Sequence, residues 1–139
     1  VKQAVSIPVL ANGDIVDADS ALHVLRQTGV DGLMIGRGAI RNPWVFREIG
    51  AALHGAAPPV VDALERKRVL LAYFDAIRDI FHTEKGALGR FKKIAKYFVD
   101  GIPRGGDLKM KVLRSQSPDE AIAWIERHFD ALEPVALAG

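Results

Sequence analysis

Two short apolar runs, each closed by glycine and followed by a helical pattern, constrain the fold of this 139-residue chain most strongly. The first run covers residues 5–10 and ends at Asn12-Gly13, and the second lies within residues 31–36. Continuous apolar runs of this length are typical of strands buried in a parallel sheet. Apolar residues recur at helical spacing after each run, over 17–28 and 42–53. The order strand, helix, strand, helix predicts a parallel sheet built from right-handed βα units.

Capping residues mark the expected ends of these two helices. Asp17 or Asp19 can cap the first helix at its start, and Gly29 can end it. Asn42 and Pro43 predict the N-cap and the first residue of the next helix. Two strands cannot close a barrel or form a two-sided sheet, so we expect further strands to come from elsewhere in the protein.

The second half of the chain is predicted to be helical. A linker rich in Pro, Ala and Gly covers residues 54–62. The expected helices are 61–81, 86–99, a short one from about 107, and one whose capping box is Ser117, Pro118 and Glu120. The apolar face of the first comprises Leu64, Leu70, Leu71, Phe74, Ile77 and Phe81, and the last buries Ile122, Trp124 or Ile125, and Phe129. We therefore expect two domains, residues 1–54 and 60–133, and assign Trp44 and Trp124 to packing.

Composition excludes several classes of site from this chain. It contains no cysteine, which excludes disulfides, thiolate metal sites and cysteine nucleophiles and fits a reducing, cytoplasmic compartment. The four histidines have no metal-ligand spacing, and the carboxylates form no evident acid/base pair, so no metal site is expected. No apolar run approaches the roughly 18 residues of a membrane span.

Polar and glycine residues follow each predicted strand. Asn12, Gly13 and Asp14 follow the first, and Gly36 and Arg37 the second. The carboxyl ends of parallel strands meet at one edge of a sheet, where ligands bind. Glycine lets a ligand approach the backbone, and the arginine guanidinium suits a phosphate. Either loop alone is well explained as a turn, but the two together predict a phosphate site.

The segments "IPVLANGDI" and "TGVDGLMIGRGAIRNPWVF" resemble the end of the catalytic domain of the tRNA-dihydrouridine synthases. These are FMN-dependent TIM-barrel enzymes with a helical C-terminal domain that recognises tRNA. The resemblance covers residues 5–50 and extends into the helical tail through "RFKKIAKYFVDGIP". It implies an α/β plus all-α fold, in which the last two βα units of a TIM barrel precede a C-terminal helical bundle.

The resemblance also implies roles for individual residues. Asn12, Gly13, Asp14, Gly36 and Arg37 match the family's FMN contacts, chiefly to the phosphate. NADPH would reduce the FMN, which delivers hydride to uracil C6 while a cysteine protonates C5. That cysteine, and a lysine and a histidine near the flavin ring, match nothing in this chain, whereas a whole barrel takes about 250 residues. We therefore expect the C-terminal part of such an enzyme, which lacks an N-terminal barrel segment and is inactive alone.

One block of the sequence is strongly basic. Residues 82–114 hold nine basic and three acidic side chains, a net charge of +6. A helical wheel places Lys85, Lys92, Lys93 and Lys96 on one face, with Arg90 beside them. Such a face either contacts an RNA phosphate backbone or is merely solvated, and the scarcity of interspersed acids favours tRNA contact.

Two other functions remain compatible with these patterns. One is another FMN-dependent TIM-barrel oxidoreductase, similar to dihydroorotate dehydrogenase, although the basic helical tail argues against it. The other is a non-catalytic RNA-binding helical module. Flavin absorbance of the whole protein would separate the two enzymes from the module.

Overall fold

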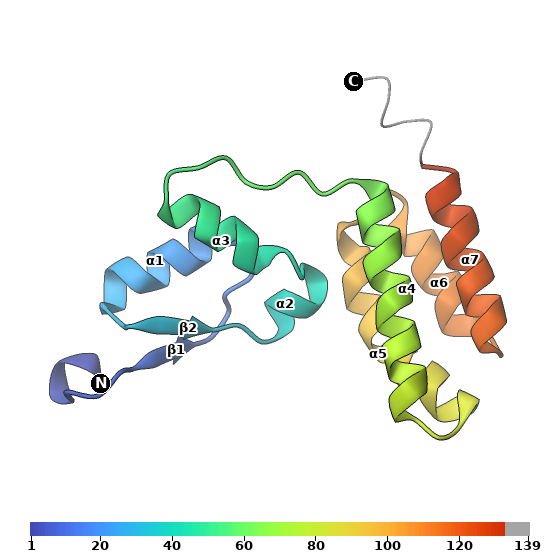
Figure 1. Ribbon diagram of the computed structural model, residues 1–139, viewed down its shortest axis with the longest axis horizontal. Coiled ribbons are helices and arrows are strands. Elements are labelled where there is room, and N and C mark those ends of the chain that lie inside the picture. Colours follow the sequence, from blue (N-terminus) through green and yellow to red (C-terminus); the bar gives the residue numbers. More distant parts are fainter. Residues whose placement is uncertain (133–139) are drawn as a thin grey trace. The chain divides into compact units, whose positions relative to one another are not determined.

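The computed structural model describes residues 1–132, which belong to two compact units (Figure 1). The first unit is Val1–Val60, and the second begins at Val61. The expected end of the helical domain, residue 133, lies outside the described residues. Between residues 1 and 132, no helix combines the length and the apolar character needed to cross a bilayer.

The first unit pairs two short strands in parallel. Its elements are η1 (Lys2–Ala4), β1 (Leu10–Asn12), α1 (Ala18–Thr28), β2 (Gly32–Met34), α2 (Arg37–Arg41) and α3 (Val45–Leu53). Leu10 lies opposite Gly32, and Asn12 lies opposite Met34. This register confirms the predicted parallel pairing and brings the carboxyl ends of both strands to one edge.

Helix α1 begins and ends at the predicted residues. The Asp17 carboxylate accepts the Ser20 N–H at 2.8 Å, and the Ser20 hydroxyl donates to it at 2.6 Å. The Ser20 side-chain hydrogen bond, followed by the backbone one, holds the pKa of Asp17 below its ordinary value. Gly29 ends the helix in the left-handed conformation at φ 63°. Local capping chemistry therefore fixes both ends of α1.

The prediction of a buried strand over residues 5–10 is wrong in position and in burial. Strand β1 starts only at Leu10, and the side chains of Ile7 and Leu10 are 66% and 58% exposed. An apolar run becomes buried only when another element covers it, and none does so within the described part of this unit. The apolar pattern predicts a strand, but it does not show which other element covers the strand's apolar side chains.

The segment after β2 also differs from the prediction. A short helix, α2, occupies residues expected to be a loop, and Asn42 ends it by donating its backbone N–H to the Gly38 carbonyl. Asn42 is therefore not the N-cap of the next helix, which begins at Val45. Its side-chain oxygen accepts the Trp44 N–H at 3.2 Å, and its amide nitrogen lies 2.8 and 2.9 Å from the two Glu48 carboxylate oxygens. Asn42 thus bridges the two helices.

Helices α1 and α3 lie side by side and supply the core of the first unit (Figure 1). Ile15, Ala21, Val45 and Ile49 are buried there, with Leu33 of β2 packed against them. Trp44 is only 4% exposed, which confirms its assignment to packing.

The second unit is a bundle of helices. Its elements are α4 (Ala63–Ile80), α5 (Glu84–Phe98), η2 (Val99–Gly101), α6 (Gly105–Arg114) and α7 (Pro118–Asp130). The rings of Phe74 and Phe91 stack at 4.1 Å between α4 and α5. Leu64 and Phe81, predicted on the buried face of α4, are exposed because they lie in its first turn and just beyond its last residue. Burial therefore covers the part of α4 that contacts α5 and α7, and not the whole apolar face.

The start of α7 agrees with the prediction except for one hydrogen bond. Ser117 is the N-cap, its hydroxyl accepts the Glu120 N–H at 3.2 Å, and Pro118 is the first residue. The Glu120 carboxylate accepts the Gln116 N–H at 2.7 Å, instead of the Ser117 N–H that a capping box uses. Ile125 and Phe129 are buried as expected, whereas Ile122 and Trp124 are half-buried.

Two adjacent glycines of α6 make a matched pair for testing this packing. A Cβ at Gly105 would clash with the Val99 carbonyl oxygen, whereas a Cβ at Gly106 would have no heavy atom within 4 Å. Gly105→Ala should therefore lower the free energy of unfolding by about 1–3 kcal/mol. Gly106→Ala should leave it equal or raise it by up to about 1 kcal/mol. Urea denaturation measures both, and equal stabilities of the two variants would contradict the close approach at Gly105.

Candidate functional site

The loops that follow β1 and β2 start side by side. The Asn12 amide nitrogen lies 3.5 Å from the Met34 sulfur across the strand pair. Further along, one guanidinium nitrogen of Arg37 lies 3.3 Å from an Asp14 carboxylate oxygen. The fold therefore brings together the two polar loops, as the strand-end argument predicts.

The Asp14–Arg37 pair faces solvent. Its side chains are 93% and 80% exposed. An ion pair of this kind is worth only about 0–1 kcal/mol, so an anionic ligand can compete for the guanidinium at little cost. Because Arg37 carries five N–H donors in a planar fork, it can hold Asp14 at one edge and a phosphate at another.

The glycines in these loops have different structural roles. A Cβ at Gly13 or Gly36 would meet no heavy atom within 4 Å, so their backbone is open to an approaching group. Gly38 is buried, and a Cβ there would clash with the Ile15 carbonyl oxygen. Gly38 therefore lets α2 pack directly on the loop after β1, and this contact sets Arg37 beside Asp14. The sequence pattern alone does not reveal this packing role of Gly38, because the oxygen that it contacts belongs to another loop.

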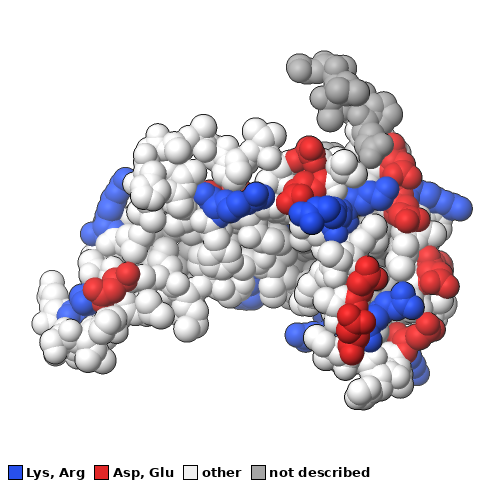
Figure 2. Space-filling view, viewed as in Figure 1, with Lys and Arg blue, Asp and Glu red and all other residues white. Residues whose placement is uncertain are grey.

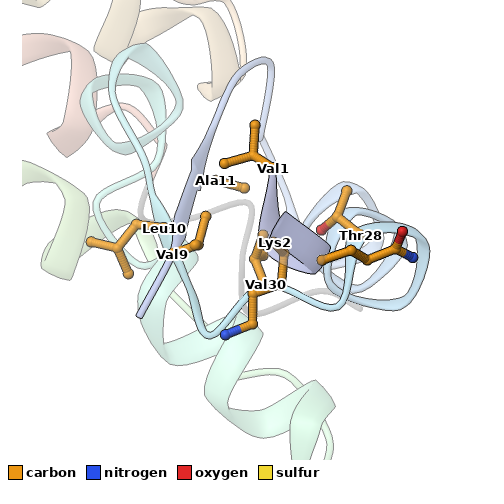
Figure 3. Close-up of a pocket in the computed structure, with 8 residues that line it drawn as sticks. Val1, Lys2, Val9, Leu10, Ala11, Thr28 and Val30 are labelled. Carbon is orange, nitrogen blue, oxygen red and sulfur yellow. The ribbon is translucent and has the colours of Figure 1, made fainter. Parts of the chain in front are cut away.

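A hollow of about 470 Å³ lies near the amino ends of the same strands. Figure 3 shows the residues around it, with Val9 and Leu10 pointing to opposite sides of the strand. The Asp31 carboxylate ties this end together, since it lies 2.6 Å from the Lys2 amine and accepts the Val9 N–H at 2.7 Å. The hydrogen bond from Lys2 holds the pKa of Asp31 below its ordinary value. The hollow has apolar walls and lies beside the exposed side chain of Leu10, so it is better suited to contact with another part of a protein than to binding a phosphate.

The cations on the predicted basic face of α5 differ in their exposure and in their partners. Lys85, Arg90 and Lys93 are exposed, and no carboxylate of residues 1–132 forms an ion pair with them. Lys96 is half-buried, with its amine 4.6 Å from the centroid of the Tyr97 ring. We refer to Lys85, Arg90, Lys93 and Lys96 as the α5 stripe.

The prediction that Lys92 points to solvent with the others is wrong. Lys92 is half-buried, and its amine donates to the Ser115 carbonyl at 2.5 Å. Ser115 is the C-cap of α6, so Lys92 satisfies a carbonyl that the end of that helix leaves without a partner. The helical wheel could not reveal this because the carbonyl belongs to another helix.

The cations of α4, by contrast, are paired with acids. Lys67 lies 2.6 Å from Asp130, and Arg68 lies 2.8 Å from Glu65. Figure 2 looks onto the α4 face of this unit, where basic and acidic side chains are interspersed. The excess of positive charge on α5 is therefore not a general property of the unit's surface.

Trp124 contacts cations as well as packing. It is half-buried, and its ring centroid lies 4.5 Å from the Lys111 amine and 5.4 Å from the Arg127 guanidinium carbon. The assignment of Trp124 to packing alone is thus incomplete. Lys111 and Trp124 lie on different helices, so helix periodicity could not have paired them.

Among residues 1–132, no group of three or more metal-ligating side chains comes together. His128 has a structural contact, with its Nε2 atom 3.0 Å from the Pro103 carbonyl oxygen. Burial lowers its pKa, and the nearby Arg104 and Lys111 lower it further. The chemistry available here is anion binding by cations, amides and exposed backbone.

Nearly the whole chain is similar in sequence to known proteins. The sequence profile described as "Dihydrouridine synthase (Dus)" matches residues 1–133. The chain is 37% identical over 134 residues to tRNA-dihydrouridine synthase B of Xanthomonas campestris pv. campestris, covering 95% of this chain and 40% of that relative. It is 35% identical over 130 residues to the protein of the same name from Pseudomonas syringae pv. tomato, covering 93% and 38%. The Escherichia coli K12 protein is 44% identical over 104 residues, covering 74% and 32%. The chain thus spans 40% or less of these curated relatives.

The different environments of Lys92 and Lys93 lead to a stability test. Lys92→Ala removes a charge-assisted hydrogen bond and leaves the Ser115 carbonyl without its donor, so it should cost about 1–2 kcal/mol of unfolding free energy. Lys93→Ala, at an exposed position on the same helix, should change stability by less than about 0.5 kcal/mol. Thermal and urea denaturation measure both. If Lys92→Ala were as neutral as Lys93→Ala, the Lys92 contact would have no structural role.

Proposed function

The chain belongs to the dihydrouridine synthase family, and on that premise we propose that the enzyme containing it reduces uridine in tRNA to 5,6-dihydrouridine. The observation that carries the proposal is the match over both units, since the helical unit is included with the α/β unit. A dihydroorotate-dehydrogenase-like enzyme would explain the first unit only. A non-catalytic RNA-binding module would leave the loops after β1 and β2 without a role.

The first unit corresponds, in this proposal, to the last two βα units of a TIM barrel. Three features support the assignment: the parallel pairing of β1 and β2, the exposed apolar side chains of Ile7 and Leu10, and the hollow near the amino ends of the strands. Strands from the rest of the barrel would cover the exposed apolar groups. Residues 1–54 are then the partial barrel, and 60–133 the helical tRNA-binding domain.

The loops after β1 and β2 fit the phosphate of FMN. Gly13 and Gly36 have open space where a side chain would be, and the guanidinium of Arg37 faces solvent. Asn12 offers an amide beside them. When bound, FMN supplies the hydride chemistry of the reaction, with NADPH as the reductant. The cytoplasm supplies both and is the proposed location.

Each residue of this site has a binding or orienting role. Arg37 binds the phosphate by charge and by its N–H donors. Asp14 would repel a phosphate directly, so its role is to orient the Arg37 guanidinium from the opposite edge. None of these residues transfers a proton to the uracil ring. The group that protonates C5 must lie elsewhere in the enzyme, because this chain has no cysteine, and the isolated chain is therefore inactive.

The α5 stripe is the proposed first contact with tRNA. Its cations Lys85, Arg90 and Lys93 are exposed and have no carboxylate partner among the described residues. Such cations neutralise phosphates and release counterions, which gives affinity without sequence readout. Lys92 is not a proposed phosphate contact, and its role is to hold the C-terminal end of α6 through the Ser115 carbonyl.

Removing the Arg37 side chain tests the flavin site. Arg37→Ala in the whole enzyme should weaken flavin binding by about 1.5–3 kcal/mol, because a charge-assisted contact to the phosphate is lost. Flavin absorbance retained after dialysis, and titration of the apoprotein with FMN, measure the effect. Arg26→Ala, at an exposed position in the last turn of α1, is the control and should bind FMN normally. Unchanged affinity in Arg37→Ala would remove Arg37 from the site.

Neutralising the α5 stripe tests the tRNA surface. Arg90→Gln with Lys93→Gln should weaken tRNA binding and reduce the slope of log affinity against log salt by about 0.7–0.9 for each lost phosphate contact. Flavin content and dihydrouridine formation at saturating tRNA should be retained. The matched control is Arg68→Gln with Arg78→Gln, which removes the same charge from α4, where both arginines have acidic partners. Equal slopes in the two double variants would make the stripe a solvated face.

A further inference from the structure

The seam between α6 and α7 carries a second group of cations, arranged around an aromatic ring. Lys111 and Arg127 lie 4.5 and 5.4 Å from the centre of the Trp124 ring. Arg104, at the start of α6, is exposed, and it directly follows Pro103, whose carbonyl oxygen lies 3.0 Å from the Nε2 atom of His128 on α7. We call Arg104, Lys111, Trp124 and Arg127 the Trp124 patch.

The cations of this patch lack strong acidic partners. Within residues 1–132, neither Lys111 nor Arg127 has a carboxylate at ion-pair distance. Arg104 has only Asp107, at 3.9 Å, and both side chains are at least 70% exposed. Their contact is therefore weak and easily exchanged. An anion can therefore bind Lys111 and Arg127 without first displacing a carboxylate.

Trp124 orders two of these cations before any partner binds. A cation over an indole face is attracted by the ring quadrupole, so part of the side-chain freedom that binding would remove is already lost. Lys111 comes from α6, whereas Trp124 and Arg127 come from α7. The packing of the two helices therefore fixes the positions of the charges, which a row of freely rotating lysines does not achieve.

Arg104 adopts a conformation that favours glycine. Its φ is 55° and its ψ is 23°, in the left-handed region, and it is the only non-glycine residue with positive φ among those described. Glycine adopts this conformation without strain, and the next two residues are glycines. An arginine at this position strains the backbone while presenting an exposed guanidinium. Backbone strain of this kind is characteristic of functional positions.

His128 lies between the cations of the seam and the Pro103 carbonyl. Burial is the largest cause that lowers its pKa, the contact with Pro103 raises it, and the charges of Arg104 and Lys111 lower it further. The positive charge of the patch is supplied by Arg104, Lys111 and Arg127. Asp107 is the acid that counters them in the surroundings of His128.

We propose that the Trp124 patch is a second tRNA-binding surface, separate from the α5 stripe, which contacts the phosphate backbone through Lys111, Arg127 and Arg104. The inference rests on the proposed function, because it takes tRNA as the partner. Trp124 is a positioning residue that holds Lys111 and Arg127 in place. Binding through two groups of cations on the helical unit anchors the RNA at two places and limits how it can rotate on the enzyme.

The first test removes the two cations that Trp124 orders. Lys111→Gln with Arg127→Gln in the whole enzyme should reduce the slope of log tRNA affinity against log salt by about 1.4–1.8. The loss of affinity between 50 and 200 mM salt should then be about 7–12 times smaller than in the parent. The control is Arg68→Gln with Arg78→Gln on α4, which should keep the parent slope. A parent slope in the Lys111/Arg127 variant would overturn the proposal.

Two single variants separate binding from folding. Arg104→Gly relieves backbone strain and removes a cation, so the melting temperature should stay equal or rise while tRNA affinity falls. Trp124→Leu keeps every charge, so affinity should fall with the salt slope unchanged, and Trp124→Phe should restore part of the affinity. Unchanged tRNA affinity in Arg104→Gly and Trp124→Leu would overturn the proposal.

The parent protein distinguishes this proposal from the function on which it rests. If the parent does not bind tRNA, the proposed function and the second surface both fail. If the parent binds tRNA and forms dihydrouridine while every patch variant binds like the parent, only the second surface fails.

Discussion

The arrangement of the α/β unit depends on one close backbone contact, between Gly38 and the carbonyl of Ile15. Any side chain at position 38 would clash with that oxygen, so the absence of a Cβ allows α2 to lie directly on the loop after β1. Arg37, the first residue of α2, then lies within 3.3 Å of Asp14. The parallel register aligns the strand ends, but the Gly38 contact brings the two loops together. Glycine therefore acts here in two ways, as a packing residue at 38 and as open backbone at 13 and 36.

The helical unit also contains a close contact between a glycine and a backbone carbonyl, and in addition a hydrogen bond from a lysine to a helix end. Gly105 lets α6 start against the Val99 carbonyl, which sets the position of the helix relative to the end of α5. At the other end of α6, Lys92 of α5 donates to the Ser115 carbonyl. Both ends of α6 are thus attached to the region of α5, while its side chain Lys111 reaches the Trp124 ring of α7. The proposed RNA surfaces on α5 and on the α6–α7 seam are consequently parts of one packed assembly.

The features that the sequence predicts well are those decided by neighbouring residues. Asp17 and Ser117 cap their helices as expected because each cap involves a residue only three positions away. The parallel pairing follows from the order of apolar runs. Predictions fail where a distant group decides the outcome. The run at residues 5–10 is exposed because no element among the described residues covers it. Lys92 is half-buried because it contacts the Ser115 carbonyl, a group 23 residues away that a helical wheel of α5 does not include. The role of Trp124 was missed for the same reason, since Lys111 approaches it from another helix.

The state of pairing of a cation is more informative than the number of cations. Lys67 and Arg68 of α4 lie 2.6 and 2.8 Å from carboxylates, so their charges are partly offset within the unit, whereas Arg78, at 3.9 Å from Glu84, is paired as loosely as Arg104 is with Asp107. Lys85, Arg90 and Lys93 of α5, and Lys111 and Arg127 of the seam, have no such partners among the described residues. A phosphate that binds a paired cation must first displace a carboxylate, and the attraction it gains is offset by the ion pair it breaks. A phosphate that binds an unpaired cation releases only counterions, which is favourable and depends on salt. A surface that binds RNA should therefore keep most of its cations unpaired, and this distinction separates the exposed cations of α5, and Lys111 and Arg127 of the seam, from Lys67 and Arg68 of α4.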